Sequence, residues 1–239
     1  VHAIVPARGG SRGIPRKNLV ELCGRPMLEY TIEDALRTPD VTEVFVSTDD
    51  DEIADVASRS GATVIRRPAE LSSDTASSES ALLHVLDVIR ERDGADPDLV
   101  VFLQATSPLR PDGAIGGAIE TVLREGADSL FSASPVHGFI WRVGDDGPVP
   151  VGYDHHRRPR RQEVGEKVEE NGSIYVFRPA VLRAGGSRLG GKIAVYWMDP
   201  MYAVQIDEPA DVVRAERAMM MSGRGDSGRT SVVTPPGQL

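Results

Sequence analysis

The chain has 239 residues, of which 40% are hydrophobic and 26% are charged, and it carries a formal net charge of −9. A chain of this size can bury one full core, and none of its apolar runs is long enough to cross a bilayer. The acidic balance argues against a general nucleic-acid binder, which needs a broad basic surface. Because the lone Cys23 excludes an internal disulfide and no signal-peptide pattern opens the chain, we expect a cytoplasmic protein.

Strand-like and helix-like patterns alternate through the first half of the chain. Apolar residues recur at helical spacing over 28–36, and the apolar run at 44–46 is typical of a buried strand. The alternation continues with helices predicted at 50–59, around 81–89 and from Pro111, and with strands predicted at 63–65 and 98–104. This order predicts an α/β fold with a doubly wound, mostly parallel sheet, whose ligands bind beyond the carboxyl ends of the strands.

The rhythm changes beyond about Ala133. Shorter strand-like segments with Gly and Pro turns run through about 134–162, which we interpret as an inserted arm. The segment GSIYVF restores a strand, and the segment AVQID with a helix from Glu208 to about Met221 closes the predicted fold. We therefore predict one domain over 1–221, with the arm at about 134–162 and a disordered tail, rich in Ser, Gly and Pro, at 222–239.

A basic loop broken by glycines, PARGGSRGIPRKN at 6–18, follows the first predicted strand. Its glycines allow backbone amides to turn toward a ligand at positive φ, and Arg8, Arg12 and Lys17 can offset the charge of a triphosphate. The spacing is neither that of a Walker A loop nor that of the dinucleotide fingerprint. A solvated turn is the alternative interpretation, but the position after a strand favours an anion site.

Six motifs follow one another along the chain: PARGGSRGIPRKNL, VSTDDDEIADVA, RRPAELSSDTASS, LQATSPLR, RPRRQ and ENGSIYVF. In order and spacing they resemble the CMP-sialic acid synthetases, or acylneuraminate cytidylyltransferases, over about residues 3–217. The resemblance implies a Rossmann-like nucleotidyltransferase fold that joins CTP to a 2-keto sugar acid with the help of Mg²⁺ and releases pyrophosphate. It also implies that the arm at about 134–162 mediates a homodimer.

The resemblance assigns roles to individual residues. For the triphosphate and part of the nucleoside it implies Arg8, Ser11, Arg12, Lys17 and Asn18. For the cytidine site it implies Arg67 and Ser78, and for the sugar acid it implies Gln104, Arg142, Arg160 and Tyr175. Arginine suits the carboxylate of a sugar acid because its planar guanidinium can bind bidentately. The basic cluster around 157–161 could instead be a solvated loop.

The expected chemistry needs an oxygen nucleophile aligned with the α-phosphate and a cation that offsets charge in the departing pyrophosphate. Magnesium suits this task because it binds one or two carboxylates and takes phosphate oxygens and water as further ligands. Asp207 is the predicted metal ligand, and it completes a predicted catalytic set with Arg8, Arg12 and Lys17. The family's Asp-x-Asp pattern is altered here, because Gln205 stands at its first position. Without a nucleophile motif, we expect direct attack by the anomeric hydroxyl of the sugar.

Three alternatives stay open at the level of the sequence. The altered pattern at Gln205 leaves room for a related acid, such as an octulosonate, a pseudaminate or legionaminate sugar, or a phosphonate. It also motivates a catalytically silent protein that binds nucleotide sugars. A nucleic-acid role through HHRRPRRQ ranks lowest because the net charge opposes it. The expected partners are therefore CTP, a 2-keto sugar acid and a second copy of the chain, without nucleic acid or membrane.

Overall fold

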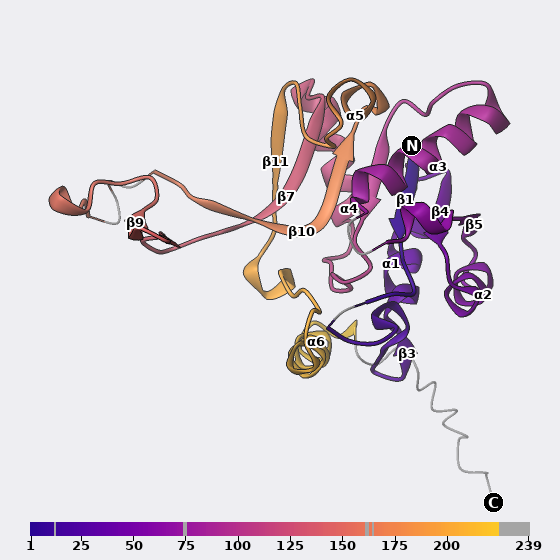
Figure 1. Ribbon diagram of the computed structural model, residues 1–239, viewed down its shortest axis with the longest axis horizontal. Helices are drawn as coiled ribbons and strands as arrows, with labels where there is room; N and C mark the ends of the chain where they lie inside the picture. The colour runs from indigo at the N-terminus through magenta and orange to yellow at the C-terminus, as the bar shows by residue number, and fades with distance from the viewer. Residues whose placement is uncertain (12, 74–75, 161–162, 164, 225–239) are drawn as a thin grey trace, which may run out of the picture.

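The computed structural model describes residues 1–224 except 12, 74, 75, 161, 162 and 164, and it centres on a seven-stranded sheet (Figure 1). The strands of this sheet are β1 (His2–Pro6), β4 (Glu43–Thr48), β5 (Thr63–Arg66), β6 (Val100–Leu103), β7 (Ser129–Pro135), β10 (Val168–Phe177) and β11 (Ile193–Trp197). They lie in the order β11-β7-β10-β6-β1-β4-β5. Strand β10 runs antiparallel to β6 and β7, and the other neighbouring pairs are parallel. The predicted mostly parallel sheet is confirmed.

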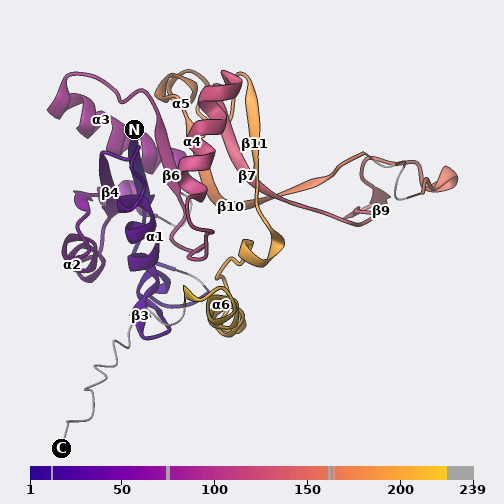
Figure 2. The same ribbon diagram turned by 180° about the vertical axis from the view of Figure 1, so that it is seen from behind.

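Helices cover both faces of the sheet (Figures 1 and 2). They are α1 (Met27–Leu36), α2 (Asp51–Arg59), α3 (Ser78–Asp93), α4 (Ala114–Glu125) and α5 (Pro179–Gly185), whereas α6 (Pro209–Met221) packs in a separate cluster with Met27 and Tyr30 of α1. Side chains alternate along β1, so Ala3 and Val5 pack with α1, α2 and α4, whereas Ile4 packs with α3 and α5 on the other face. This arrangement is the predicted doubly wound fold. Within the described residues, no helix has both the length and the apolar character that crossing a bilayer requires.

One helix begins later than predicted, and the closing segment before α6 has an irregular form. The helix expected from Pro111 begins instead at Ala114, because Gly113 adopts φ 76° and the Ala114 amide closes a turn on the Pro111 carbonyl. The segment AVQID at 203–207 joins no strand of the sheet. It is tied to the core by one backbone hydrogen bond from Ile206 to the Thr106 carbonyl, 2.9 Å long, and this bond brings it against the loop that follows β6.

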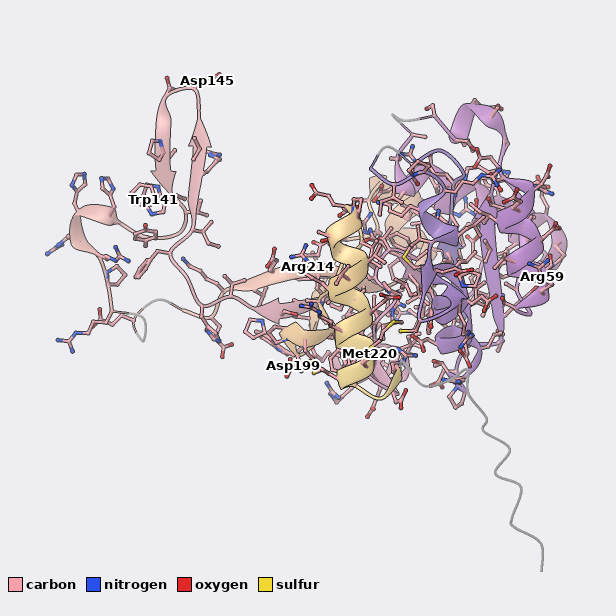
Figure 3. The ribbon with its side chains drawn as sticks, turned by 90° about the horizontal axis from the view of Figure 1, so that it is seen from below. Arg59, Trp141, Asp145, Asp199, Arg214 and Met220 are labelled. Carbon is pink, nitrogen blue, oxygen red and sulfur yellow. The ribbon has the colours of Figure 1, made fainter. Side chains whose placement is uncertain are left out.

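A long arm leaves the sheet between β7 and β10 and ends in a hairpin of β8 (Trp141–Gly144) and β9 (Gly147–Pro150). Figure 3 shows Trp141 and Asp145 on this hairpin, far from Arg214 and Met220 on α6. The hairpin exposes large apolar side chains, including Trp141 and Val143, which is 79% exposed. An apolar surface of this kind on a projecting arm is typical of a surface that contacts another chain.

Candidate active site

A cavity of about 550 Å³ opens beyond the carboxyl ends of β1 and β6. The loop after β1, the start of α3, the loop after β6 and the residues just before α6 all contribute to its wall. Parallel strands end at the same edge of a sheet, so the fold brings these distant loops together. Predicted site residues on the wall are Arg8, Ser11, Lys17, Asn18, Arg67, Ser78, Gln104 and Asp207.

The loop after β1 lies very close to its neighbours, and its glycines make this approach possible. The Gly9 amide donates to Asp49 Oδ1 over 3.0 Å. A Cβ atom at Gly13 would lie 2.3 Å from the backbone oxygen of Asp207, which is closer than any real contact. Gly9 and Gly10 do not adopt the positive φ that we predicted for them. Gly9 and Gly13 therefore allow close packing, whereas a Cβ atom at Gly10 would meet open space.

Side chains of the same loop are held in place by contacts across the cavity mouth. Arg8 Nη1 donates to the backbone oxygen of Ser73 over 2.9 Å, and the buried Asn18 amide donates to the Arg8 carbonyl over 2.9 Å. Lys17 Nζ lies 2.8 Å from Asp207 Oδ1. These contacts keep two cations, Arg8 and Lys17, at the wall of one cavity, where they can attract a polyanion.

The opposite wall combines a buried arginine with the start of a helix. Arg67 Nε donates to Ser47 Oγ over 3.0 Å and its Nη2 to the Ser47 carbonyl over 2.7 Å. Burial lowers the pKa of the Arg67 guanidinium. Ser77 rather than Ser78 caps α3, accepting from the Ser80 amide, so Ser78 is a wall residue and not the cap. Helix capping alone therefore does not account for Ser78.

Arg110, which is not among the predicted site residues, anchors the loop after β6. Its side chain is buried, and Nη2 donates to the backbone oxygens of Gln104 and Ser173 over 3.0 Å each. Its Nη1 donates to Thr31 Oγ1 over 3.1 Å and lies 3.8 Å from Asp34 Oδ2. Burial lowers the pKa of Arg110 to about 10. The local signal in the sequence is weak: one arginine that follows Leu109 and precedes Pro111 in SPLRP.

Two amide side chains converge over Gly172, which has φ 69° in the bulge of β10. A Cβ atom at Gly172 would lie 2.0 Å from Gln205 Nε2 and 2.7 Å from Gln104 Oε1. Gln205 Nε2 donates to the Asn171 carbonyl over 2.8 Å. Glycine is required here both by its backbone conformation and by the two amides that occupy the place of a side chain.

The backbone at Asp207 is fixed by a carboxylate inside the first turn of α6. Asp211 Oδ2 accepts from the amides of Asp207 and Glu208 over 2.9 and 2.8 Å. These hydrogen bonds to the charged form lower the pKa of Asp211 to about 2. The Asp211 carboxylate is thus engaged in capping the helix, whereas the Asp207 side chain stands at the cavity wall.

Four predicted site residues are not placed at this cavity. Arg142 and Arg160 are exposed on the arm, and Tyr175 is buried with its ring stacked 5.3 Å from that of Phe102. Phe102 itself lines the cavity, so Tyr175 lies behind the wall. Arg12 lies outside the described residues. The cavity of a single chain therefore gathers the residues predicted for the nucleotide more completely than those predicted for the sugar acid.

For CTP, the nucleotide that the sequence motifs imply, we expect Gly13→Ala to raise the KM at least tenfold, because the added Cβ would push the loop away from the Asp207 backbone. Gly10→Ala is the matched control, since a Cβ at Gly10 meets nothing within 4 Å. Steady-state kinetics of both variants check the prediction. Equal KM values for the two variants would contradict it.

We expect Asp211→Asn to lower stability at neutral pH, and the loss to shrink in acid. The folded pKa of Asp211, about 2, lies below the ordinary aspartate value of 3.8, so its stabilisation is present above pH 4 and disappears as the pH falls toward 2. Urea unfolding of wild type and variant between pH 2.5 and pH 7 measures the difference. Asp55→Asn, on the exposed side of α2, should show no such trend.

The mostly parallel sheet, with Arg8, Lys17 and Arg67 lining a cavity at its carboxyl edge, defines an α/β protein suited to binding a polyanion. A family described as Cytidylyltransferase matches residues 2–142, and the chain belongs to this family. N-acylneuraminate cytidylyltransferase A of Danio rerio is 36% identical over 98% of this chain and 54% of its own length. Pseudaminic acid cytidylyltransferase of Campylobacter jejuni is 32% identical over 72% of this chain and 75% of its own length. The resemblance found in the sequence is confirmed.

Solved structures share the fold. A CMP:2-keto-3-deoxy-manno-octonic acid synthetase complexed with CTP has a TM-score of 0.69 at 19% identity, covering 92% of this chain and 98% of that chain. A 4-diphosphocytidyl-2C-methyl-D-erythritol synthase from Anaerococcus prevotii has a TM-score of 0.64 at 17% identity, covering 92% and 95%. The chain spans about half the length of the fish relatives that it matches, 54% and 51% of two of them.

Proposed function

We propose that the protein transfers CMP from CTP to the anomeric hydroxyl of a sialic-acid-like 2-keto sugar acid and releases pyrophosphate. One observation carries the proposal: a single cavity gathers the basic loop after β1, Arg67, Ser78, Gln104 and Asp207. A polyphosphate needs the cations, and the sugar needs donors and acceptors such as the Gln104 amide. The relatives named above, which act on N-acylneuraminate and on pseudaminic acid, support the same class of acceptor.

In this proposal the chain works by positioning and electrostatics. Arg8 and Lys17 bind the triphosphate, with Ser11 and Asn18 beside them, and Arg12 belongs to the same predicted loop. Lys17 is paired with Asp207 before the nucleotide arrives, so entering phosphate oxygens exchange one anionic partner of Lys17 for another. The exchange keeps the charge of Lys17 compensated throughout, while the α-phosphate is held for direct attack by the sugar hydroxyl.

The residues present fit a Mg²⁺ ion that binds mainly to the nucleotide. Within the described residues, no three His, Cys, Asp or Glu side chains lie together as a metal site, and the Gln205 nitrogen is bonded to a backbone carbonyl. Asp207 would supply the protein ligand, which suits Mg²⁺ because this ion readily takes its remaining ligands from phosphates and water. When bound, the ion would offset charge on the departing pyrophosphate.

For the carboxylate of the sugar acid we propose Arg142 or Arg160 from the arm of a second chain in a homodimer. Both side chains are exposed on the projecting arm, away from the cavity of their own chain. The exposed apolar hairpin around Trp141 supports an arm that packs against a second chain. Mixing two inactive variants, Lys17→Met and Arg160→Met, tests shared sites, since mixed dimers should regain activity and unrestored activity would count against sharing.

The central experiment measures pyrophosphate release by the purified full chain with CTP, UTP or ATP and a panel of 2-keto acids, with and without magnesium. The proposed function predicts turnover with CTP and a nine-carbon acid that depends on the metal. Preference for a pseudaminate or octulosonate would select the alternative acid. Tight CTP binding without turnover on any acid would indicate a silent binding protein instead.

A further inference from the structure

A second cavity, of about 210 Å³, lies beside the candidate active site and takes no part in the function proposed so far. Its wall consists of Ser134 on β7, Glu169, Glu170 and Asn171 on β10, and Ala203 and Gln205 before α6. The segment that leads from β11 to α6 passes beside β10 where β10 leaves the sheet for the arm (Figures 1 and 2). Three segments distant in sequence therefore enclose it.

The two cavities adjoin each other across Gly172. Gln104 lines the main cavity and Gln205 lines the second one, and both amides lie at the place where a Gly172 side chain would be. Since Gly172 has no side chain, the two amides approach each other at the boundary between the cavities. A ligand bound at Gln104 therefore meets hydrogen-bonding groups of the protein in both cavities.

The two cavities differ in charge, which gives a long ligand a preferred direction. Arg8, Lys17 and Arg67 line the main cavity, whereas Glu169 and Glu170 line the second one. The Glu170 carboxylate already accepts from the Tyr175 hydroxyl and lies 3.9 Å from Arg188, so the exposed Glu169 is the acceptor that remains for a ligand. Ionised carboxylates only accept hydrogen bonds, so the second cavity suits hydroxyl groups and repels anions.

The geometry points to the second cavity as the subsite for the hydroxylated three-carbon tail of a nine-carbon sugar acid, with Glu169 and Gln205 as specificity determinants. This inference rests on the proposed function. A volume of about 210 Å³ corresponds to roughly seven waters, which is enough for three carbons and their hydroxyls. Gln205 serves this role better than an aspartate would, because its amide nitrogen holds the Asn171 carbonyl of the bulge in place without adding a third negative charge.

The test compares a nine-carbon acid with the seven-carbon acid obtained by removing two carbons from its tail, using the purified full chain and saturating CTP. We expect Glu169→Ala to lower kcat/KM for the nine-carbon acid about tenfold and to change it less than twofold for the seven-carbon acid. The KM for CTP should stay within twofold of wild type. Gln205→Leu should give the same selective loss. The control is Glu91→Gln, which changes an exposed carboxylate near the far end of α3 and should match wild type for both acids.

Equal losses for both acids, or no loss for either, would overturn the subsite while leaving the proposed function standing. A wild-type protein that turns over no acid at all would overturn the proposed function, and the subsite with it. Saturation-transfer NMR on the nine-carbon acid gives a second readout: protons of the tail should receive less saturation in Glu169→Ala than in wild type. Unchanged saturation of the tail protons would contradict the assignment even if kinetic values fall.

Discussion

Lys17→Met should lower kcat/KM for CTP by about 10² to 10³-fold, the range found when one group that stabilises a developing anion is removed. Lys17 Nζ stands at the cavity wall 2.8 Å from Asp207 Oδ1, and it is the compact cation best placed to meet phosphate oxygens. Without it, Asp207 also loses its partner, so the entering triphosphate meets an uncompensated negative charge. Steady-state pyrophosphate release, with calorimetry for CTP binding, measures both effects.

Arg16→Met is the control for Lys17→Met, because Arg16 belongs to the same loop but pairs with Asp50 and Glu52 rather than lining the cavity. We expect the kcat/KM of Arg16→Met to stay within about threefold of wild type, because an exposed ion pair contributes little energy. If the two variants lose activity equally, general loop charge rather than a specific contact of Lys17 controls nucleotide binding.

Arg110→Met should destabilise the fold by about 3 to 5 kcal/mol, as is typical when one member of a buried charge pair is removed. The backbone oxygens of Gln104 and Ser173 and the hydroxyl of Thr31 would each lose a donor in a site closed to water. The Asp34 carboxylate would lose the nearby Arg110 guanidinium and keep its ion pair with Arg224. Urea denaturation followed by circular dichroism measures the loss in the free energy of unfolding.

Arg224→Met is the matched variant for Arg110→Met, because Arg224 pairs with the same Asp34 carboxylate and donates to the Arg110 carbonyl. Its side chain is more exposed, 14% against 1% for Arg110, so we expect a loss of only about 1 to 2 kcal/mol. Arg110→Lys should not restore stability, because an ammonium cannot reproduce the planar fork that serves three acceptors. A fully stable Arg110→Met protein would show that the burial cost of the cation outweighs its bonds.

Regular periodicity was enough to predict most of the fold. Buried strands and amphipathic helices have local patterns. The elements close to their predicted places are therefore β1, α1, β4, α2, β5 and α3. The start of α4 was wrong by three residues because Pro111 fits a turn as well as a first helical turn. Strand β11, at Ile193–Trp197, was not predicted at all, since it pairs with β7 through contacts far apart in sequence.

The part of the candidate site that lies on one loop was predictable from the sequence. Arg8, Ser11, Lys17 and Asn18 share the loop after β1, and the position after a parallel strand predicts a ligand. Arg110 and Gly172 were not predictable, because their importance depends on partners brought near by the fold. The roles of Arg142 and Arg160 remain predictions that depend on a second chain.

By itself the sequence determined the alternation of strands and helices in the first half of the chain, the edge of the sheet at which the cavity opens, and the basic loop that lines this cavity. All three follow from patterns within a few residues, where spacing alone controls which side chains share a face. Tertiary structure decided which polar groups meet: Lys17 with Asp207, Gln205 with Asn171, and Arg110 with Ser173. Such pairs form because a buried polar group must find a partner wherever the fold provides one, and distance along the chain does not enter that requirement.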